Sequence, residues 1–472
     1  MRLGLGAAYA VLLAALAFPV LLVNVPVGID TLAHLARLHA RAHIETDPDI
    51  ARLFAVRQGL IPYMAMDWLL TPLVSVMSAL QVGRIVTVLC VWCVVGSVAV
   101  LSRAFQGYWG TAPLLAGVIA WNGITAWGFL NYLLGLSMAL GTLALWHVLR
   151  DRPGWQRVLV FGVAAAGLYV MHLLALVLYA GLIGLYAVFF GAWHPRHWPV
   201  MAAQFAPPVL LWLAYAPPIP QGKLGVMYNL PAAVISFASP TLFPSAEGGW
   251  ESGHLVLLAT VLGLAGLTRA GLVTWHRPLL AMAGVLCLLG LALPVVAVGI
   301  SWLNLRLPLA SACVAISAIR FHGSRHWGWA VAGLVLVRVA SVAATMKACA
   351  PDYAELRQAM QVLPRGVALT PVLERQAPAH SCSWLPIYEH AANLVTLERA
   401  GLSSDYFAQT TSVTGRGGVP TDRKAIEMAD ASRMDLGKYV LWMHRGRLWP
   451  LPAGAVVLAR ASFFDVLRID GR

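Results

Sequence analysis

The sequence has few charged residues, and acidic residues are nearly absent from its first 346 positions. Only 11% of the 472 residues are charged, 59% are hydrophobic, and the mean hydropathy is +0.73. Soluble domains carry roughly 25% charged residues, so this composition excludes an ordinary soluble protein and predicts a polytopic α-helical membrane protein embedded in a lipid bilayer. The net charge of +13 does not indicate a nucleic-acid partner, because the basic residues are scattered singly between apolar runs.

Familiar catalytic motifs are missing as well. No P-loop, GxSxG, HExxH or dinucleotide-binding fingerprint stands in a suitable context, which argues against nucleotide hydrolysis. Cysteine is scarce, with six in the chain. Cys90 and Cys93 have CxxC spacing but lie in an apolar run, where cysteine usually behaves as a small hydrophobic residue. Cys349 and Cys382 lie in a polar tail, where an oxidising compartment would allow them to pair, an alternative that the sequence leaves open.

Runs of about 20 apolar residues predict eleven membrane-spanning helices. They lie at residues 5–25, 84–103, 111–129, 131–149, 157–172, 173–191, 199–217, 254–270, 278–299, 303–320 and 327–346. The first run is longer than the core of a signal peptide, so we expect it to be retained. Residues 60–82 are apolar but interrupted by Pro62, Asp67 and Pro72, which favours a helix at the membrane interface over a twelfth span.

The basic residues predict the orientation of the chain. If the N-terminus lies in the cytoplasm, the cytoplasmic turns are rich in arginine and contain one acid, Asp151, as the positive-inside rule requires. The opposite face then holds a first outer loop at 26–83 and a second long outer loop at 218–253. We therefore expect a multi-pass protein of the bacterial inner (plasma) membrane with its C-terminal region in the periplasm.

The composition changes at Lys347. Residues 347–472 hold 12 acids and 15 bases, a balance typical of a soluble domain. The stretch DYAELRQAMQVL has the pattern of a helix, whereas KYVLWM and AVVLARASFFDVLRI predict strands. Glycine and proline in TSVTGRGGVPTDRKA predict a flexible loop. The chain thus divides into a transmembrane domain at 1–346 and a small periplasmic α/β domain at 347–472.

Five of the eight acids in the first 346 residues lie in the first outer loop. They are Asp30, Glu45, Asp47, Asp49 and Asp67. A carboxylate beside a bilayer is costly unless it is solvated or has a functional role. The loop therefore contains the first candidate site.

Asp30, His34 and Arg37 are spaced to share one face of a helix that begins near Asp30. In a structural interpretation, Asp30 caps this helix and the face is solvated. In a functional interpretation, these are catalytic residues. Asp30 accepts a proton from a bound hydroxyl group, while His34 and Arg37 support it and stabilise a departing phosphate.

The sequence Asp47-Pro48-Asp49 also has two interpretations. It has the pattern of a helix start, with Asp47 as N-cap, proline at the first position and an acid in the first turn. The same two carboxylates are suited to bind a divalent cation, the one cofactor that the sequence suggests, or to orient a diphosphate through it.

Further candidate residues lie at the outer ends of the predicted spans. Arg306, in SWLNLRLP, is the only basic residue in the short outer turns, and it either snorkels to headgroups or holds a lipid phosphate. Asn131 ends the aromatic turn WNGITAWGFLN, which suits an interfacial belt or a platform for sugar stacking. His172 falls between two apolar runs, where it is either packed or functional. We expect Arg306, Asn131, His172 and Asp67 to contact the donor or substrate.

The order of these features resembles the GT-C fold of membrane glycosyltransferases. One helix is followed by a long outer loop with an early acid, a proline-interrupted interface helix, many spans and an outer C-terminal domain. The resemblance implies that the protein takes a sugar from a polyprenyl-phosphate carrier on the outer face, and that Asp30 is the essential acid of the first outer loop. Asp47 and Asp49 match the Asp-x-Asp spacing of that family, and Arg306 is similar to the cations that bind the carrier. The usual adjacent Asp-Glu pair is absent, since Thr31 follows Asp30.

The leading hypothesis is a glycosyltransferase that moves a sugar from a polyprenyl-phosphate donor to an envelope glycan or lipid acceptor. One alternative is a transporter or flippase of a lipid-linked or polar substrate, although no inverted repeat is visible and the spans contain few charged residues. The other is a non-catalytic scaffold for envelope assembly, with the tail as its partner surface.

Overall fold

The computed structural model describes residues 2–57, 59–191, 193–215, 225–244, 252–297, 300–322, 326–374, 382, 386–406, 413–416, 426–427, 436–444 and 450–470. Within these ranges the chain is mostly helical, and four helices are long and apolar enough to cross a membrane: Gly4–Leu21, Ala79–Gln106, Gly154–Met171 and Gly328–Met360. Shorter apolar helices accompany them at Met64–Val74, Ala112–Trp127, Leu173–Phe189, Gly253–Arg269, Arg277–Ala292 and Arg306–Ser317. This helical content is compatible with the membrane protein that the composition predicts.

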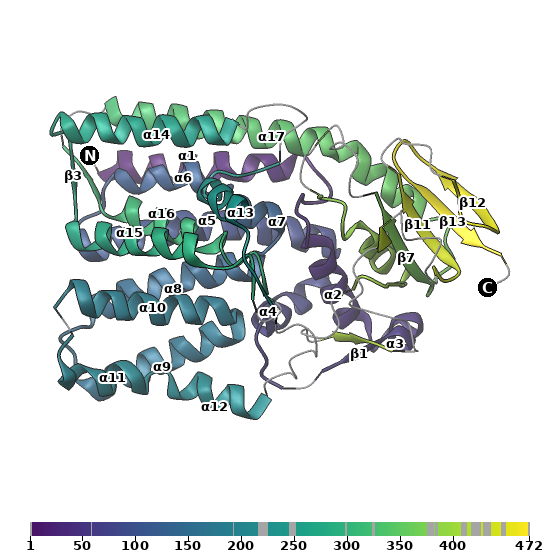
Figure 1. The fold of residues 1–472 in the computed structure, drawn as a ribbon, viewed down its shortest axis with the longest axis horizontal. Helices are drawn as coiled ribbons and strands as arrows, with labels where there is room; N and C mark the ends of the chain where they lie inside the picture. Colours follow the sequence, from purple (N-terminus) through teal and green to yellow (C-terminus); the bar gives the residue numbers. More distant parts are fainter. Residues whose placement is uncertain are drawn as a thin grey trace.

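The apolar helices lie side by side along the long axis of the molecule (Figure 1). They are α1 (Arg2–Leu21), α5 (Ala79–Gln106), α6 (Ala116–Ile119), α7 (Gly123–Trp127), α8 (Leu130–Val148), α9 (Gly154–Met171), α10 (Leu173–Phe189), α11 (Trp198–Ala203), α12 (Ala206–Tyr215), α14 (Ser252–Arg269), α15 (Arg277–Ala292), α16 (Arg306–Ser317) and α17 (His326–Met360). Large apolar side chains also cover the outside of this block, where Val11, Val163 and Leu213 are 69%, 69% and 76% exposed. Helices that are apolar on all sides suit a lipid environment.

Two of the predicted spans are broken rather than continuous. The run at 111–129 forms a 3-10 turn at Ala112–Leu115, then α6, then α7. Asn122 caps the start of α7, because its side-chain oxygen accepts hydrogen bonds from the N–H groups of Ile124 and Thr125 at 3.0 Å. Its side-chain nitrogen donates to the carbonyls of Ile119 and Ala120, at the end of α6. The run at 199–217 is divided between α11 and α12.

Short elements join the helices at both ends of the block. At one end, β3 (Val273–Trp275) pairs antiparallel with β6 (Ile319–Phe321). Toward the other end lie α13 (Leu230–Ile235), a 3-10 turn at Ser236–Ala238, and the sheet of β2 (Val226–Met227), β4 (Val296–Ala297) and β5 (Ile300–Ser301). Glu247 and Glu251 of the predicted second outer loop lie outside the described residues.

The first outer loop is folded, and its first helix is buried. It contains α2 (Thr31–His43), α3 (Pro48–Leu53), β1 (Phe54–Val56) and α4 (Met64–Val74). The predicted helix near Asp30 is confirmed as α2. The structural interpretation of a solvated polar face is wrong, because Arg37 on that face is 2% exposed and pairs with the buried Asp67. The apolar stretch at 60–82 forms α4, followed by a turn and the start of α5 at Ala79.

The C-terminal region forms a mixed sheet at one end of the helical block (Figure 1). Its strand order is β10 (Ile426–Glu427), β7 (Ala368–Leu373), β11 (Tyr439–Met443), β13 (Asp465–Ile469) and β12 (Ala455–Arg460), with β8 (Leu402–Ser403) paired to β7. The predicted strands in KYVLWM and AVVLARASFFDVLRI are confirmed, and apolar residues of β11 are buried in the sheet. Most of the predicted flexible loop lies outside the described residues, but its Val413–Gly415 forms β9, which pairs with β1.

The composition change at Lys347 falls inside one continuous helix. α17 runs for 35 residues, from the apolar block into the C-terminal region, and includes most of the helix predicted at DYAELRQAMQVL. After the sheet begins, the 3-10 turn η4 (Ala391–Asn393) and α18 (Leu394–Arg399) pack against α2. The two predicted domains are thus connected by a shared helix and by direct contact with the first outer loop.

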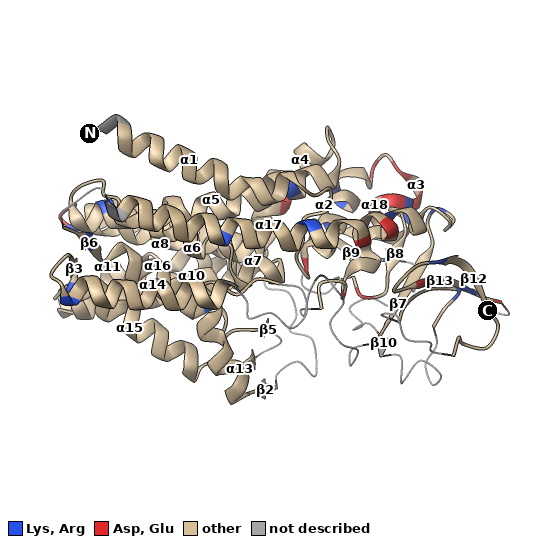
Figure 2. Ribbon diagram, turned by 90° about the horizontal axis from the view of Figure 1, so that it is seen from above, with Lys and Arg blue, Asp and Glu red and all other residues tan. Residues whose placement is uncertain are grey.

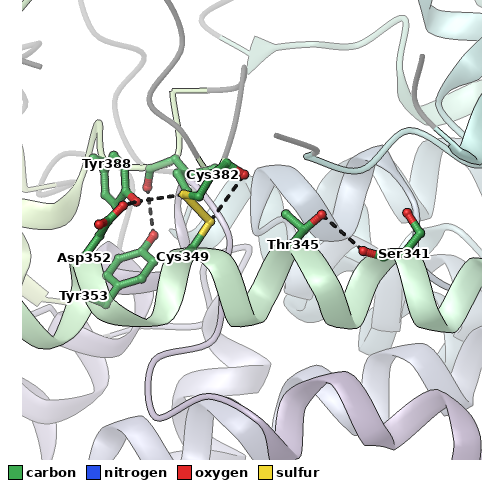
Figure 3. Close-up of a disulfide and its surroundings, with 8 residues drawn as sticks. Ser341, Thr345, Cys349, Asp352, Tyr353, Cys382 and Tyr388 are labelled. Atoms are coloured by element: carbon green, nitrogen blue, oxygen red, sulfur yellow. Dashed lines mark hydrogen bonds between the residues drawn. A yellow bond between two sulfur atoms is a disulfide. The ribbon is translucent and has the colours of Figure 1, made fainter. Parts of the chain in front are cut away.

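A disulfide fixes the segment that precedes η4 (Figure 3). Cys349 of α17 is bonded to Cys382, with a Cα–Cα distance of 5.2 Å, so the pairing that the sequence left open is present. Nearby, the Tyr388 hydroxyl donates a hydrogen bond to Asp352 at 2.5 Å, and that of Tyr353 donates to the carbonyl of Ile387 at 3.1 Å. These contacts hold the segment that leads to His390 against α17.

Candidate functional site

Asp30 is seated on the turn between α7 and α8. The N–H groups of Ile29 and Asp30 donate hydrogen bonds to the carbonyls of Ala126 and Trp127, at 3.1 and 3.0 Å. Gly128 allows this close approach, because it has φ +77° and an added Cβ would lie 2.7 Å from the nitrogen of Thr31. The backbone of Asp30 is therefore fixed by a second element of the helical block.

The Asp30 side chain does not act as a helix cap. Asp30 occupies the N-cap position of α2, but within this described stretch its carboxylate makes no cap hydrogen bond. The side chain is 18% exposed and lies 3.6 Å from Nε2 of His390. Burial raises the pKa of Asp30 to about 6, an effect that the charges of His390 and Arg306 oppose. A carboxylate that is ionised at neutral pH and free of a capping role can act as a base.

His390 connects Asp30 to a buried polar cluster of the C-terminal region. Its Nδ1 lies 3.0 Å from Oδ2 of Asp405, which is 1% exposed. The other oxygen of Asp405 accepts hydrogen bonds from Asn393, at 3.1 Å, and from Ser403. Burial by itself lowers the pKa of His390. The hydrogen bond to Asp405, with the charges of Asp30 and Glu389, instead raises this pKa to about 9.

Arg37 and Asp67 form a buried ion pair with each other. Nε of Arg37 lies 2.9 and 3.1 Å from the two oxygens of Asp67, and both side chains are at most 3% exposed. Nδ1 of His34 lies 3.0 Å from Nη1 of Arg37. Burial and the charges of Arg37 and His390 lower the pKa of His34 well below its ordinary value, so His34 is neutral. The expectation that His34 and Arg37 are cations beside a departing phosphate is therefore corrected, since one is neutral and the other is paired.

Arg306 is a buried guanidinium without an acidic partner among the described residues. It begins α16 and is 7% exposed. Its Nη1 donates a hydrogen bond to the carbonyl of Ser301 at 2.8 Å, and its guanidinium lies 4.6 Å from the ring centre of Phe129 and 5.5 Å from that of Tyr132. Its Nε is buried and has no hydrogen-bond partner in the described structure. Buried charges are normally paired, so an arginine with these contacts is a candidate to bind an anionic ligand.

Asn131 and His172 lie beside Arg306 but have different surroundings. Asn131 donates a hydrogen bond to the carbonyl of Tyr63 at 3.3 Å, and its own side-chain oxygen is buried without a partner in the described structure. Nδ1 of His172 accepts a hydrogen bond from the N–H of Leu174 at 3.1 Å and so caps α10. The His172 ring packs edge-on against Tyr63 and Tyr132. This geometry favours the packed interpretation of His172, whereas the Asn131 carbonyl is available to a ligand.

Strained backbone marks the same neighbourhood. Tyr63 and Trp302 have φ of +73° and +57°, a conformation that costs a non-glycine residue about 1–3 kcal/mol. Trp302 packs against Trp127 with ring centres 4.6 Å apart. Such strain is concentrated at functional sites. Trp302 lies four residues before Arg306, and the carbonyl of Tyr63 accepts the hydrogen bond from Asn131.

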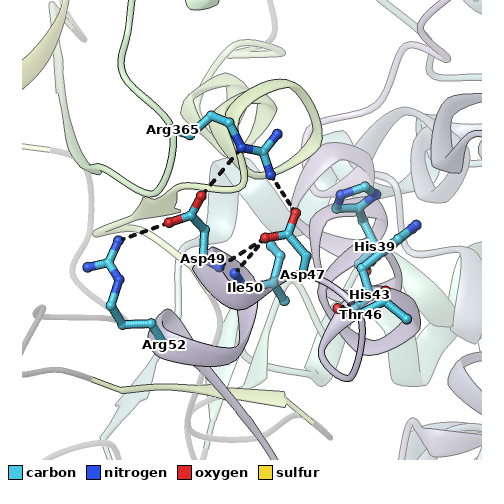
Figure 4. Close-up of polar contacts among 8 residues, drawn as sticks. All are labelled: His39, His43, Thr46, Asp47, Asp49, Ile50, Arg52 and Arg365. Carbon is cyan, nitrogen blue, oxygen red and sulfur yellow. Dashed lines mark hydrogen bonds and ion pairs between the residues drawn. The ribbon is translucent and has the colours of Figure 1, made fainter.

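Asp47 and Asp49 are occupied by other contacts (Figure 4). Asp47 caps α3 by accepting hydrogen bonds from the N–H groups of Asp49 and Ile50, at 2.9 and 3.4 Å. Arg365 pairs with both acids, and Arg52 pairs with Asp49 at 3.5 Å. Among the described residues, no group of three or more histidine, cysteine or acidic side chains is arranged to hold a metal ion. The helix-start interpretation is confirmed for Asp47, and the suggested cation site at this pair is not supported.

No protein-family model matches the chain, and no curated protein matches its sequence. Its function is therefore inferred from the residues of the site.

The structure brings together residues that lie far apart in sequence. Asp30, His34, Arg306 and His172 are close enough to influence one another electrostatically. His390 and Asp405 belong to the same environment, but they were missed by reasoning from the sequence. They lie in a stretch with soluble composition and no motif, so no sequence signal places them beside the first outer loop.

Proposed function

We propose that the protein is a membrane glycosyltransferase similar to GT-C enzymes, which moves a sugar from a polyprenyl-phosphate donor to a glycan or lipid acceptor on the outer face of a bacterial plasma membrane. The observation that carries this proposal is the combination of Asp30 and Arg306. Asp30 is a carboxylate that makes no helix-cap hydrogen bond, and Arg306 is a buried cation without an acidic partner among the described residues. A base and an anion-binding group in one site suit transfer from a phosphate leaving group.

The proposed step uses these two residues on opposite sides of the sugar. The acceptor hydroxyl gives its proton to the Asp30 carboxylate as its oxygen bonds to the anomeric carbon. The bond from that carbon to the phosphate oxygen breaks, and the electron pair leaves with the phosphate. Arg306 stabilises the resulting negative charge. The side-chain oxygen of Asn131, which has no hydrogen-bond partner among the described residues, accepts a hydrogen bond from a sugar hydroxyl. With a pKa of about 6, Asp30 is ionised at neutral pH and remains basic enough to take the proton.

Two observations support an outer location for this site. The Cys349–Cys382 disulfide is typical of an oxidising compartment, and it lies on the segment that leads to His390. Figure 2 shows Asp and Glu gathered around α2, α3 and α18, whereas the opposite end, near β3 and β6, is mainly basic. In this proposal the eleven apolar runs cross the bilayer, the basic end faces the cytoplasm, and the sheet region lies in the periplasm.

The direct test uses membranes that contain the protein and a panel of radiolabelled polyprenyl-phosphate sugars. We expect Asp30→Asn to reduce covalent transfer by roughly 10²–10⁴-fold, because it removes the base but keeps the volume. Asp49→Asn is the matched control and should retain transfer, since Asp49 pairs with surface arginines. Full transfer by Asp30→Asn would falsify the assignment.

The alternative functions give different results in the same preparation. A transporter or flippase would move a labelled lipid-linked substrate across proteoliposomes without covalent transfer. A scaffold would keep full cellular function after loss of Asp30. Deletion of the C-terminal region does not separate these functions, because His390 contacts the Asp30 site directly.

A further inference from the structure

The C-terminal region contributes an imidazole to the Asp30 site. η4 and α18 pack against α2, and His390 stands immediately before η4. Its ring lies between two carboxylates, with Nδ1 3.0 Å from Asp405 and Nε2 3.6 Å from Asp30. The longer distance on the Asp30 side leaves that carboxylate free to accept a proton from another group.

The Asp405 side of this arrangement is rigid. Asp405 is buried at 1% exposure, and Asn393 and Ser403 donate hydrogen bonds to its second oxygen. A carboxylate held in this way fixes the orientation of the imidazole that it contacts and favours its protonated form. The Cys349–Cys382 disulfide and the Tyr388–Asp352 hydrogen bond hold the preceding segment on α17. The position of His390 is thus determined from several directions.

We propose that His390, oriented and kept protonated by Asp405, is a positioning residue that sets the protonation state of Asp30, so that the C-terminal region is an integral part of the site. This proposal rests on the proposed function and extends it, because it names the residue that controls the protonation of the base, Asp30. It does not depend on the identity of the sugar or acceptor.

The charges around the pair explain why His390 matters. Asp30 faces the cations His390 and Arg306 as well as the acids Glu389 and Asp405. His390 faces Asp405, Asp30 and Glu389, while neighbouring His34 is neutral. If His390 loses its positive charge, Arg306 opposes the negative charges of Glu389 and Asp405 near Asp30 without the help of His390. Protonation of Asp30 then becomes easier, and its carboxylate is no longer available at neutral pH.

A carbodiimide measures this effect without a substrate. Dicyclohexylcarbodiimide adds to a protonated carboxyl group, takes up its proton on nitrogen and leaves an acylurea on the side chain. The full-length protein in detergent is treated between pH 4 and 9, and the modified Asp30 peptide is quantified by mass spectrometry. A small carboxylic acid of known pKa, treated with the reagent in parallel, corrects for the pH dependence of the reagent.

We expect half-maximal modification of Asp30 near pH 6 in the unmodified sequence and at least about 1 pH unit higher in His390→Gln. His390→Lys should restore the lower midpoint because it retains the positive charge. Asp405→Asn should shift the midpoint in the same direction but by less than His390→Gln, because His390 then loses its charge more readily while a negative charge that raises the pKa of Asp30 is also removed. Thermal unfolding of each variant verifies that it is folded.

Two results would overturn the proposal. One is an Asp30 midpoint that is unchanged in both His390→Gln and Asp405→Asn. The other is an equal shift in His390→Gln and His390→Lys, which would mean that packing rather than charge is responsible. Failure of the proposed glycosyltransferase function would be a separate result, because it is judged from sugar transfer by Asp30→Asn and not from the pH midpoint of Asp30 modification.

Discussion

At the residue scale, the most informative side chain is a buried arginine that lacks an acidic partner among the described residues. A guanidinium in this position destabilises the folded protein unless a ligand compensates it. Arg338 provides a comparison within the same chain. It is 1% exposed and donates a hydrogen bond to the carbonyl of Trp121 at 2.8 Å. Each arginine is buried and donates one hydrogen bond to a backbone carbonyl, that of Ser301 or that of Trp121, so these contacts do not distinguish them. Arg306 differs because its charge acts on the Asp30 carboxylate.

Substitution of these two arginines should therefore affect transfer differently. We expect Arg306→Met to abolish transfer, because it removes the cation beside Asp30, whereas Arg338→Met should retain it. Each substitution leaves one backbone carbonyl, that of Ser301 or that of Trp121, without its donor and should lower the free energy of unfolding by roughly 1–3 kcal/mol. Denaturation in detergent, with transfer measured on the same samples, separates the two effects. Retained transfer in Arg306→Met would contradict this interpretation.

Individual side chains also determine how the rate of sugar transfer depends on pH. We expect the rate to rise as pH increases through about 6, because Asp30 must be ionised, and to fall through about 9, because His390 must be protonated. His390→Gln should shift the acid limb upward and remove the alkaline limb. A profile that is flat between pH 5 and 10 would contradict the roles of both groups.

Stability should follow the protonation of His390 as well. Its pKa in the folded protein, about 9, lies above the ordinary value of 6.5, so the stabilisation is fully present below pH 6.5 and is lost as pH rises through 9. The expected loss is on the order of 1–3 kcal/mol. Thermal unfolding at pH 6, 7.5 and 9.5 measures it. A pH slope that persists unchanged in His390→Gln would show that another group is responsible.

At the scale of elements, the turn between α7 and α8 determines where Asp30 lies. We expect Gly128→Ala to reduce both stability, by about 1–3 kcal/mol, and transfer, because the glycine has φ +77° and a Cβ would press on the nitrogen of Thr31. Gly141→Ala is the matched control, since Gly141 lies in the adjacent helix α8 and a Cβ there has no atom within 4 Å among the described residues. Equal behaviour of the two variants in unfolding and transfer measurements would argue against this role of the turn.

The disulfide stabilises another part of the chain, the segment that leads to η4. Cys349 and Cys382 are separated by 33 positions, and closing a loop of this size stabilises a protein by roughly 3–4 kcal/mol. We expect Cys349→Ser with Cys382→Ser to lower the unfolding temperature and also to weaken transfer, because His390 is held less firmly. Cys287→Ser, which removes a free cysteine of α15, is the control. Full transfer activity in the double variant would show that the disulfide does not contribute to the function of the site.

At the scale of the whole molecule, the sequence predicted the helices better than their contacts. Long apolar runs predict helices because the backbone must satisfy its hydrogen bonds internally in an apolar environment. Each of the eleven predicted runs overlaps helix in the structure, and the strands around Val440 and Leu467 are confirmed. The break at Asn122 and the continuity of α17 across Lys347 depend on local capping and tertiary packing, which composition does not reveal.

The candidate site could likewise be predicted only in part, because it depends on tertiary contacts that the sequence does not reveal. Asp30 and Arg306 were found because each departs from the charge pattern of its surroundings. The neutral state of His34 and the pairing of Arg37 with Asp67 follow from burial, which helical spacing alone cannot show. His390 lies 360 positions after Asp30, and only the folded chain brings them together.

The proposed orientation of the whole molecule can be tested by cysteine labelling in spheroplasts. We expect a membrane-impermeant maleimide to label Arg460→Cys from outside and Trp155→Cys only after the membrane is opened, since these exposed residues lie at opposite ends of the proposed topology. The parent protein with its native cysteines provides the background. Labelling of Trp155→Cys in intact spheroplasts would contradict this orientation.

The contact between Asp30 and His390 also has a consequence for biosynthesis. Asp30 follows the first apolar helix, whereas His390 lies 360 positions later and leaves the ribosome after all the apolar helices. In the proposed topology, the C-terminal region must be exported and oxidised before His390 can reach Asp30. A nascent chain would therefore expose the lipid-facing helices and the proposed base long before the site is complete, and the proposed activity would begin only after the C-terminal region has folded.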